Sequence, residues 1–447
     1  MDRKKILTRL LCVVGVCTLI LSAVAAKKKY KSPILLIPGL GGSQLDEKTK
    51  GYRPDTCWTH GRYQKVWYDI QMTPNCAKDL SLRYDKSSNT YRNKTGVKIR
   101  VPGFGETNTV EYSVKDTAVF VKKIKRKYMR NLVEHFAKCG YERGVSIRAA
   151  PYDWRLAADE LDRTGYFKEV KGLIEEMRKA NRQRVTIVAH SMGGLVSHYF
   201  LTSYSGINKS WKKKHIKAWI TLGTPWGGAI KTIQPVLANK KTAPLKCEEL
   251  SETLIFLIKK SPIIKHYAPK CASWSILVPF GRTFESTAWL LPKPSLFGDK
   301  VLVETNSRKY TANDYEKLFD RINYDDGYAM FKGTQQINSD KYPNVPTYCY
   351  YGKKVKSTPE KFTYTSIKDS KPKITYGDGD GTVNIESLRA CDTQWSGRKK
   401  FKSKEFDSVD HQDILSDKAV LKYIAKIVGA RGCGSMEQLE QLLEALN

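Results

Sequence analysis

The sequence predicts a single α/β domain, built on a parallel sheet, over residues 31–430. Three observations lead to this prediction. Short apolar runs alternate along the chain with segments of helical periodicity, as strands and helices do around a parallel sheet. One of these runs leads directly into a tight turn and a helix. Apolar residues make up 41% of the chain and charged residues 27%, which excludes a disordered chain and a multi-span membrane protein.

The predicted strands follow in chain order. The apolar run 33–37 ends at a proline and a glycine, and the runs 185–189 and 216–222 are the strongest further candidates. Weaker strand patterns lie at 347–351 and 374–376. The second run continues through a short turn into a helical stretch at 195–204. Strand, tight turn and helix in this order are typical of the turn that carries a catalytic nucleophile.

The N-terminus resembles a secretory signal. Basic residues at positions 3–5 precede an apolar run over residues 10–24, and small residues follow it. This layout predicts a cleaved signal peptide over residues 1–26, while the length of the run leaves an uncleaved signal anchor as the alternative. We therefore expect a protein of the secretory pathway, either lysosomal or extracellular.

The cysteines and glycosylation sequons fit that compartment. Eight cysteines remain outside the predicted signal peptide, which allows complete pairing in disulfides. Cys139 and Cys433 have no partner suggested by spacing, and spacing alone does not determine connectivity. The sequons N-K-T and N-K-S predict glycans at Asn93 and Asn208. The pairs that spacing suggests are Cys57 with Cys76, Cys247 with Cys271, and Cys349 with Cys391.

The chain is strongly basic. Its formal charge is +32, and the predicted signal holds four basic residues and one acidic residue, so the remainder carries +29. A field of this size favours an anionic partner. No nucleic-acid-binding module is recognisable and the lysines are scattered, so we expect no nucleic acid and favour an anionic membrane surface. A lysine-rich solvated surface without a partner is the alternative.

Three segments depart from the alternation of strands and helices. Residues 57–76 form a short aromatic-rich loop, and residues 240–285 form a long insertion that includes an apolar run at 254–258. The tail 431–447 has leucines at helical spacing among glutamates, which predicts a helix that packs on the body or on a second copy. The sequence leaves the oligomeric state open.

Ser191 is the predicted nucleophile. It lies in A-H-S-M-G, which differs from the G-x-S-x-G pattern by an alanine, still a small residue, at the first glycine position. Small residues are needed around such a serine because its strained backbone lifts the hydroxyl above the sheet. Without the flanking strand and helix, the pentapeptide would be equally consistent with an ordinary turn.

The acid and the base should follow the nucleophile in chain order. The segment D-G-D-G-T-V at 378–383 comes directly after a predicted strand, and of its two aspartates we choose Asp380 over Asp378. A glycine-rich acidic turn or a calcium loop is the alternative, but the full set of EF-hand ligand positions is missing. Only one of the seven histidines follows Asp380, and it is His411. We expect His60, His215 and His266 at surface or loop positions.

The oxyanion hole should combine two backbone amides. One is the amide of Met192, directly after the nucleophile, and the other comes from the glycine-rich loop after the first strand, where Leu40 is the expected donor. Together with Ser191, Asp380 and His411, these positions predict an α/β-hydrolase fold. This chemistry needs neither a metal nor an organic cofactor.

Seven motifs, in order along the chain, resemble those of the lecithin-cholesterol acyltransferase family, and within it most resemble the group XV lysosomal phospholipase A2 branch. They span about residues 33–429, and that many colinear motifs exclude a chance match. The motifs are L-I-P-G-L-G-G-S-Q-L at 36–45, R-V-P-G-F-G at 100–105, A-P-Y-D-W-R at 150–155, A-H-S-M-G-G at 189–194, L-G-T-P-W-G-G at 222–228, G-D-G-D-G-T-V-N at 377–384 and D-H at 410–411.

The resemblance implies roles for the unusual segments. It assigns the same triad and oxyanion residues, makes the insertion 240–285 a lid, and makes the disulfide-closed loop 57–76 a small membrane-binding subdomain. The alternative is that the aromatic side chains of this loop pack on the core. The candidate lipid-facing residues are Trp58, Tyr63, Val66, Trp67, Ile70 and Met72.

The resemblance also implies the reaction. We expect a serine-dependent phospholipase A and transacylase that cleaves fatty acyl esters of membrane glycerophospholipids and passes the acyl group to water or a lipid alcohol. A sterol-esterifying acyltransferase and a neutral-lipid esterase are the alternatives with the same chemistry. An inactive lipid-binding protein is the alternative from another class, and the complete set of catalytic candidates argues against it.

Overall fold

The computed structural model describes residues 31–50, 61–67, 74–114, 126–237, 278–337, 340–367, 372–430 and Cys433. Its centre is a six-stranded sheet in which all neighbouring strands run parallel. The strands lie in the order β17 (Phe401–Asp407), β14 (Thr347–Lys353), β11 (Ile216–Leu222), β10 (Val185–His190), β1 (Ile34–Ile37) and β9 (Ile147–Ala149).

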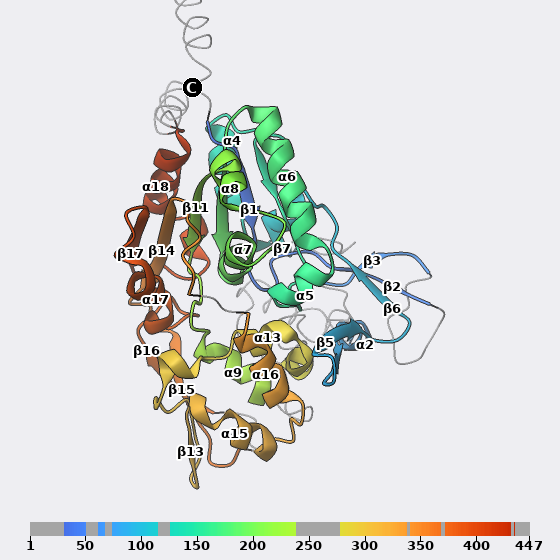
Figure 1. The fold of residues 1–447 in the computed structure, drawn as a ribbon. Helices are drawn as coiled ribbons and strands as arrows, with labels where there is room; N and C mark the ends of the chain where they lie inside the picture. Colours follow the sequence, from blue (N-terminus) through green and yellow to red (C-terminus); the bar gives the residue numbers. More distant parts are fainter. Residues whose placement is uncertain are drawn as a thin grey trace, which may run out of the picture.

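Helices cover both faces of this sheet (Figure 1). Successive side chains of a strand point to opposite faces, and β1 shows this directly. Its Ile34 and Leu36 belong to one buried cluster with α4 (Arg130–Lys138) and α18 (Lys418–Val428). Leu35 and Ile37 belong to another cluster, with helices α6 (Tyr166–Asn181), α7 (Met192–Thr202) and α17 (Ile385–Trp395). The predicted α/β fold with a parallel sheet is confirmed.

Four of the five predicted strands belong to the central sheet, and the fifth does not. The run 374–376 is part of β16 (Lys373–Gly377), which pairs antiparallel with β15 (Thr358–Thr363). These two strands form a separate four-stranded sheet with β12 (Val303–Glu304) and β13 (Lys309–Tyr310). The prediction was wrong here because β16 is mostly solvent-exposed, whereas a central parallel strand is buried on both faces.

A cap with its own hydrophobic cluster lies below the carboxyl ends of the central strands (Figure 1). It is larger than the predicted insertion 240–285, of which the structure describes only the part from residue 278 onward. The described cap helices all lie in the chain between β11 and β14, and the β15–β16 hairpin completes the cap. The cap helices are α9 (Ile233–Leu237), α13 (Glu285–Trp289), α14 (Pro294–Phe297), α15 (Tyr315–Arg321) and α16 (Gly327–Gln335), with the 3-10 turns η1 (Ile230–Thr232), η2 (Val278–Thr283) and η3 (Ala312–Asp314).

Smaller elements complete the described part of the chain. Three short strands form an antiparallel sheet beside the central domain, and two hairpins lie near it. Among the described residues, no helix is both long and apolar enough to cross a membrane. The elements are β2 (Asp46–Thr49), β3 (Gln64–Lys65) and β6 (Val97–Arg100) in the sheet; β4 (Leu82–Asp85), β5 (Thr90–Asn93), β7 (Tyr112–Val114) and β8 (Arg126–Lys127) in the hairpins; and α2 (Pro74–Asp79), α3 (Asn108–Glu111), α5 (Ala158–Arg163), α8 (Lys209–His215) and the 3-10 turn η4 (Asp413–Leu415).

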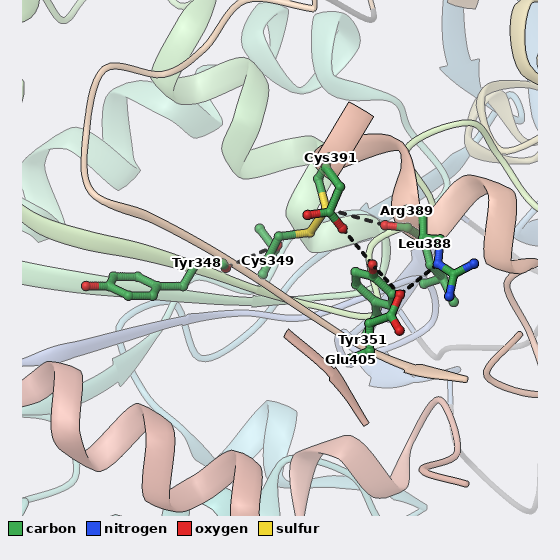
Figure 2. Close-up of a disulfide and its surroundings, with 9 residues drawn as sticks. Tyr348, Cys349, Tyr351, Leu388, Arg389, Cys391 and Glu405 are labelled. Atoms are coloured by element: carbon green, nitrogen blue, oxygen red, sulfur yellow. Dashed lines mark hydrogen bonds and ion pairs between the residues drawn. A yellow bond between two sulfur atoms is a disulfide. The ribbon is translucent and has the colours of Figure 1, made fainter. Parts of the chain in front are cut away.

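Two disulfides join the described elements. Cys349 and Cys391 are bonded as predicted, and they fasten helix α17 to strand β14 (Figure 2). The two cysteines that spacing left over, Cys139 and Cys433, are bonded to each other. Cys76 is disulfide-bonded, and its predicted partner Cys57 lies outside the described residues.

Several other predictions also fall outside the described residues. They are the signal peptide 1–26, the Cys247–Cys271 pair, the candidate lipid-facing residues Trp58, Ile70 and Met72, His60 and His266, and, apart from Cys433, the tail 431–447.

Candidate active site

Ser191 occupies a sharp turn between β10 and α7. Its φ of 55° and ψ of −130° lie in a region that side-chain-bearing residues rarely adopt, which is the strain expected of a nucleophile turn. The Ser191 amide donates to the carbonyl of Leu222 at the end of β11 (2.8 Å). A Cβ on Gly194 would lie 1.9 Å from Thr224 Oγ1, so the small residues after the serine are a steric necessity.

The structure brings Ser191, His411 and Asp380 into one hydrogen-bonded line. His411 Nε2 lies 2.9 Å from Ser191 Oγ, and His411 Nδ1 lies 2.6 Å from Asp380 Oδ2. Asp380 is 1% exposed and His411 is 7% exposed. The remaining Asp380 oxygen, Oδ1, accepts from the amides of Thr382 and Val383 at 3.1 and 2.7 Å. Both carboxylate oxygens are therefore held in place.

The neighbouring Asp378 has a different environment. It is exposed, and its Oδ1 accepts from the backbone amides of Lys354 (2.5 Å) and Gly379 (2.7 Å). It caps a turn, whereas His411 Nδ1 is bonded to Asp380. The geometry thus favours Asp380 over Asp378 as the acid of the triad.

Asp380 reaches the site by a different route from the one predicted. It follows β16, a strand of the small cap sheet, rather than a strand of the central sheet. A parallel bridge to Val355 then places it just beyond the end of β14. The Cys349–Cys391 disulfide fastens the next helix to the same strand (Figure 2), so the Asp380 loop is anchored on both sides.

Gly223, in the motif L-G-T-P-W-G-G, lies against the acid and the base of the triad, a role that the sequence alone did not predict. Its φ is +60°, and a Cβ there would lie 3.1 Å from Asp380 Oδ2 and 3.2 Å from His411 Nδ1. A side chain would therefore press on the hydrogen bond between acid and base. The signal available in the sequence was a glycine directly after a buried strand.

The turn 38–42 is held by hydrogen bonds from several directions. The Gly42 amide donates to the Gly39 carbonyl (2.9 Å) and closes the turn, and Tyr152 Oη donates to the Pro38 carbonyl (2.9 Å). A Cβ on Gly39 would lie 2.7 Å from Ser191 Cβ, so the turn passes directly beside the nucleophile. Leu40 is the next residue of this turn, and its role as an oxyanion-hole donor stays a prediction.

Trp67 also holds this turn, which corrects the prediction that it faces lipid. Trp67 is 3% exposed, its Nε1 donates to the Gly41 carbonyl (2.8 Å), and its ring lies 4.7 Å from that of Trp154. Val66 is buried in the same cluster. Burial of an apolar side chain against the core is more favourable than exposing it to water, so these two residues serve packing. Tyr63, by contrast, is 36% exposed and stays available to a surface.

The other histidines lie in three environments. His135 and His198 lie in helices α4 and α7. His215, predicted at the surface, is buried at the end of α8, where its ring stacks on Trp211. His190 is buried too, and burial, with a smaller contribution from His411, lowers its pKa to about 3. Burial therefore favours the neutral form of the His190 imidazole.

One cluster of potential metal ligands occurs among the described residues. His135, Cys139 and Cys433 place their ligand atoms within 4.8 Å of one another. Because Cys139 and Cys433 form a disulfide, their sulfurs are not available as thiolate ligands. The cluster is structural.

The two sequon asparagines differ in exposure. Asn208 is exposed at the start of α8, where its Oδ1 accepts from the Trp211 amide (2.8 Å). Asn93 is half-buried, and its Oδ1 accepts from Arg155 Nη2 (2.8 Å). Both of these hydrogen bonds are made to the side-chain oxygen, and the atom that a glycan would modify is the side-chain amide nitrogen.

Comparison with known proteins identifies the family. Residues 63–425, well over half of the chain, match the family described as lecithin:cholesterol acyltransferase. The chain belongs to the lecithin:cholesterol acyltransferase family. The resemblance inferred from its motifs is confirmed, and the sheet order and helix layers are those of an α/β-hydrolase.

The relatives of this chain include proteins named as lysosomal phospholipases and proteins named as sterol acyltransferases. The lysosomal phospholipase A and acyltransferase of Rattus norvegicus is 31% identical over 92% of this chain and 93% of its own length. The protein of the same name from Bos taurus is 33% identical over 89% of this chain and 92% of its own. The phosphatidylcholine-sterol acyltransferase of Mus musculus is 31% identical over 90% and 86%.

Proposed function

We propose that this family member is a phospholipase A and transacylase that uses Ser191 as its nucleophile. The observation that carries the proposal is the hydrogen-bonded line from Ser191 through His411 to the buried Asp380. Neutral His411 removes the serine proton as the hydroxyl attacks a fatty acyl ester, and Asp380 keeps the imidazole in the required tautomer. The lipid alcohol leaves with that proton, and an acyl-enzyme remains.

The negative charge on the carbonyl oxygen needs backbone donors. The Leu40 and Met192 amides are the proposed pair, since one lies in the turn beside Ser191 and the other directly follows it. The Gly39 amide is already used, because it donates to Tyr128 Oη (2.8 Å). This leaves the next amide, that of Leu40, as the nearer candidate from the turn.

Water or a lipid alcohol completes the reaction by attacking the acyl-enzyme. The test is mass spectrometry of products from liposomes that contain a phosphatidylcholine with two distinguishable acyl chains, with and without a long-chain alcohol. We expect lysophospholipid and free fatty acid without the alcohol, and a new ester of the alcohol when it is present. The absence of any lysophospholipid would contradict the proposal, and a new ester formed only with sterol would favour the sterol acyltransferase instead.

We further propose that the small sheet β3-β2-β6 contributes to binding an anionic phospholipid surface. Tyr63 is exposed on it, with the Arg100 guanidinium 4.2 Å and the Lys48 amine 5.9 Å from its ring centroid. Arg62 and Lys98 are exposed nearby on the same sheet or the turn before it. An aromatic ring surrounded by basic groups is suited to the interface between anionic head groups and acyl chains.

Neutralising this sheet should weaken binding to anionic vesicles. Each basic residue close to an anionic bilayer adds about 1 kcal/mol, so Arg62→Gln with Lys98→Gln should lower partitioning roughly thirtyfold. The matched control is Lys399→Gln with Lys400→Gln, two exposed lysines just before β17, on the opposite side of the molecule in Figure 1. Co-sedimentation with vesicles of phosphatidylserine and phosphatidylcholine measures the effect. Equal losses in both pairs, or binding that is indifferent to salt, would contradict a specific basic surface.

A further inference from the structure

We propose that Tyr128 and His190 are positioning residues for the acyl-transfer reaction. Half-buried Tyr128 and buried His190 form a series of hydrogen bonds that ties the turn beside the nucleophile to the backbone of the base His411. The inference rests on the proposed function of Ser191 and His411. It adds two residues that touch neither substrate nor the reacting atoms but hold in place the groups that do.

The direction of every hydrogen bond in this chain is determined. The Gly39 amide can only donate, so Tyr128 Oη accepts from it (2.8 Å). The His411 carbonyl can only accept, so His190 Nε2 carries the proton and donates to it (2.7 Å). A neutral imidazole protonated at Nε2 has an acceptor at Nδ1, and the Tyr128 hydroxyl donates to that nitrogen (2.7 Å). Each of the three hydrogen bonds therefore has one defined donor and one defined acceptor.

His190 has the environment that this arrangement requires. It is the last residue of β10 and is 3% exposed, so a charged imidazolium there would be costly. The ring of His411 lies beside it, with 4.9 Å between ring centroids, which further disfavours a second positive charge when His411 is protonated during the reaction. A neutral His190 can keep one fixed tautomer through the catalytic cycle.

The two ends of the chain lie where catalysis needs rigidity. At one end, the Tyr128 ring packs against the turn, since a Cβ on Gly42 would lie 2.7 Å from Tyr128 Cε1. The Tyr128 hydroxyl accepts a hydrogen bond from the Gly39 amide of the same turn. At the other end, the bond to the His411 carbonyl complements a bond from the His411 amide to the Asp380 carbonyl (2.8 Å). The backbone of the base is thus held from both sides. An error of about 1 Å in such positions can cost a hundredfold in rate.

The test compares Tyr128→Phe and His190→Asn with a control that loses an equivalent buried hydroxyl. Tyr141 serves as the control because it belongs to the hydrophobic cluster against which Tyr128 packs. Its hydroxyl donates to the Ser32 carbonyl (2.9 Å), a bond that is not part of the series from Gly39 to His411. Rates are measured on p-nitrophenyl butyrate, a soluble ester that needs no membrane. Thermal unfolding of each variant is measured alongside, with Ser191→Ala as the reference for loss of the nucleophile.

We expect Tyr128→Phe and His190→Asn each to lower kcat about tenfold to a hundredfold while KM changes less than about twofold. The double variant should be no slower than the slower single variant, because each change breaks the same chain. Tyr141→Phe should reduce thermal stability but keep kcat. The proposal is overturned if Tyr128→Phe keeps kcat within about twofold, or if Tyr141→Phe lowers kcat equally. Full activity in Ser191→Ala would instead overturn the proposed function itself.

Discussion

Replacing Ser191 by alanine is expected to remove activity on both phospholipid vesicles and soluble esters, by a factor on the order of a million. The serine oxygen is the atom that forms the acyl-enzyme, and it is hydrogen-bonded to His411 Nε2. Alanine has no atom that could replace it. Folding should be unaffected. The strained backbone of the turn depends on the small residues that follow it and on the hydrogen bond from the backbone amide of residue 191 to the Leu222 carbonyl, and the substitution changes neither.

The measurement is the initial rate of ester hydrolysis, with labelling by a fluorophosphonate probe as a second readout. Ser203→Ala is the matched control, since Ser203 is exposed at the end of the same helix α7 and should change neither rate nor labelling. Residual turnover above about one part in a thousand in a clean preparation would mean that another residue is the nucleophile.

Replacing Asp380 by asparagine is expected to lower kcat by about ten-thousandfold, whereas the same change at Asp378 should cost less than about tenfold. Asparagine keeps the oxygen that accepts from Thr382 and Val383, so the loop should keep its shape. Its amide group would face His411 Nδ1 as a donor, however, and this would impose the tautomer in which Nε2 carries a proton and cannot accept the one from Ser191. Asp378 has no such role, because it is exposed and its Oδ1 accepts from two backbone amides.

Rates of the two variants should be compared at several pH values, with His411→Ala as the reference for complete loss of the base. A larger effect at Asp378 than at Asp380 would reverse the assignment of the acid. Equal and small effects at both positions would mean that His411 is oriented by its backbone contacts alone.

Local patterns in the sequence determined the chemistry of this site. The strand before Ser191 is mostly apolar, glycines and an alanine lie close to the serine in sequence, and a single histidine follows the acidic segment. Order along the chain is enough to assign these roles because the fold fixes the sequence in which nucleophile, acid and base occur. The motifs indicated the family for the same reason, since each motif is a short local segment and all of them occur in the same order along the chain.

Tertiary structure decided what depends on contacts between distant segments. Trp67, an aromatic residue in a loop that sequence patterns associate with lipid, is buried by Trp154 and bonded to Gly41. The strand before Asp380 joins the cap sheet, because its exposed side chains do not suit a sheet buried on both faces.

The pairing of Cys139 with Cys433, across 294 residues, and the chain from Gly39 through Tyr128 and His190 to His411 have no local signature. The spacing of apolar residues along the sequence indicates which strand or helix they form. The burial and the hydrogen-bond partners of a side chain depend instead on the distant segments that pack against it.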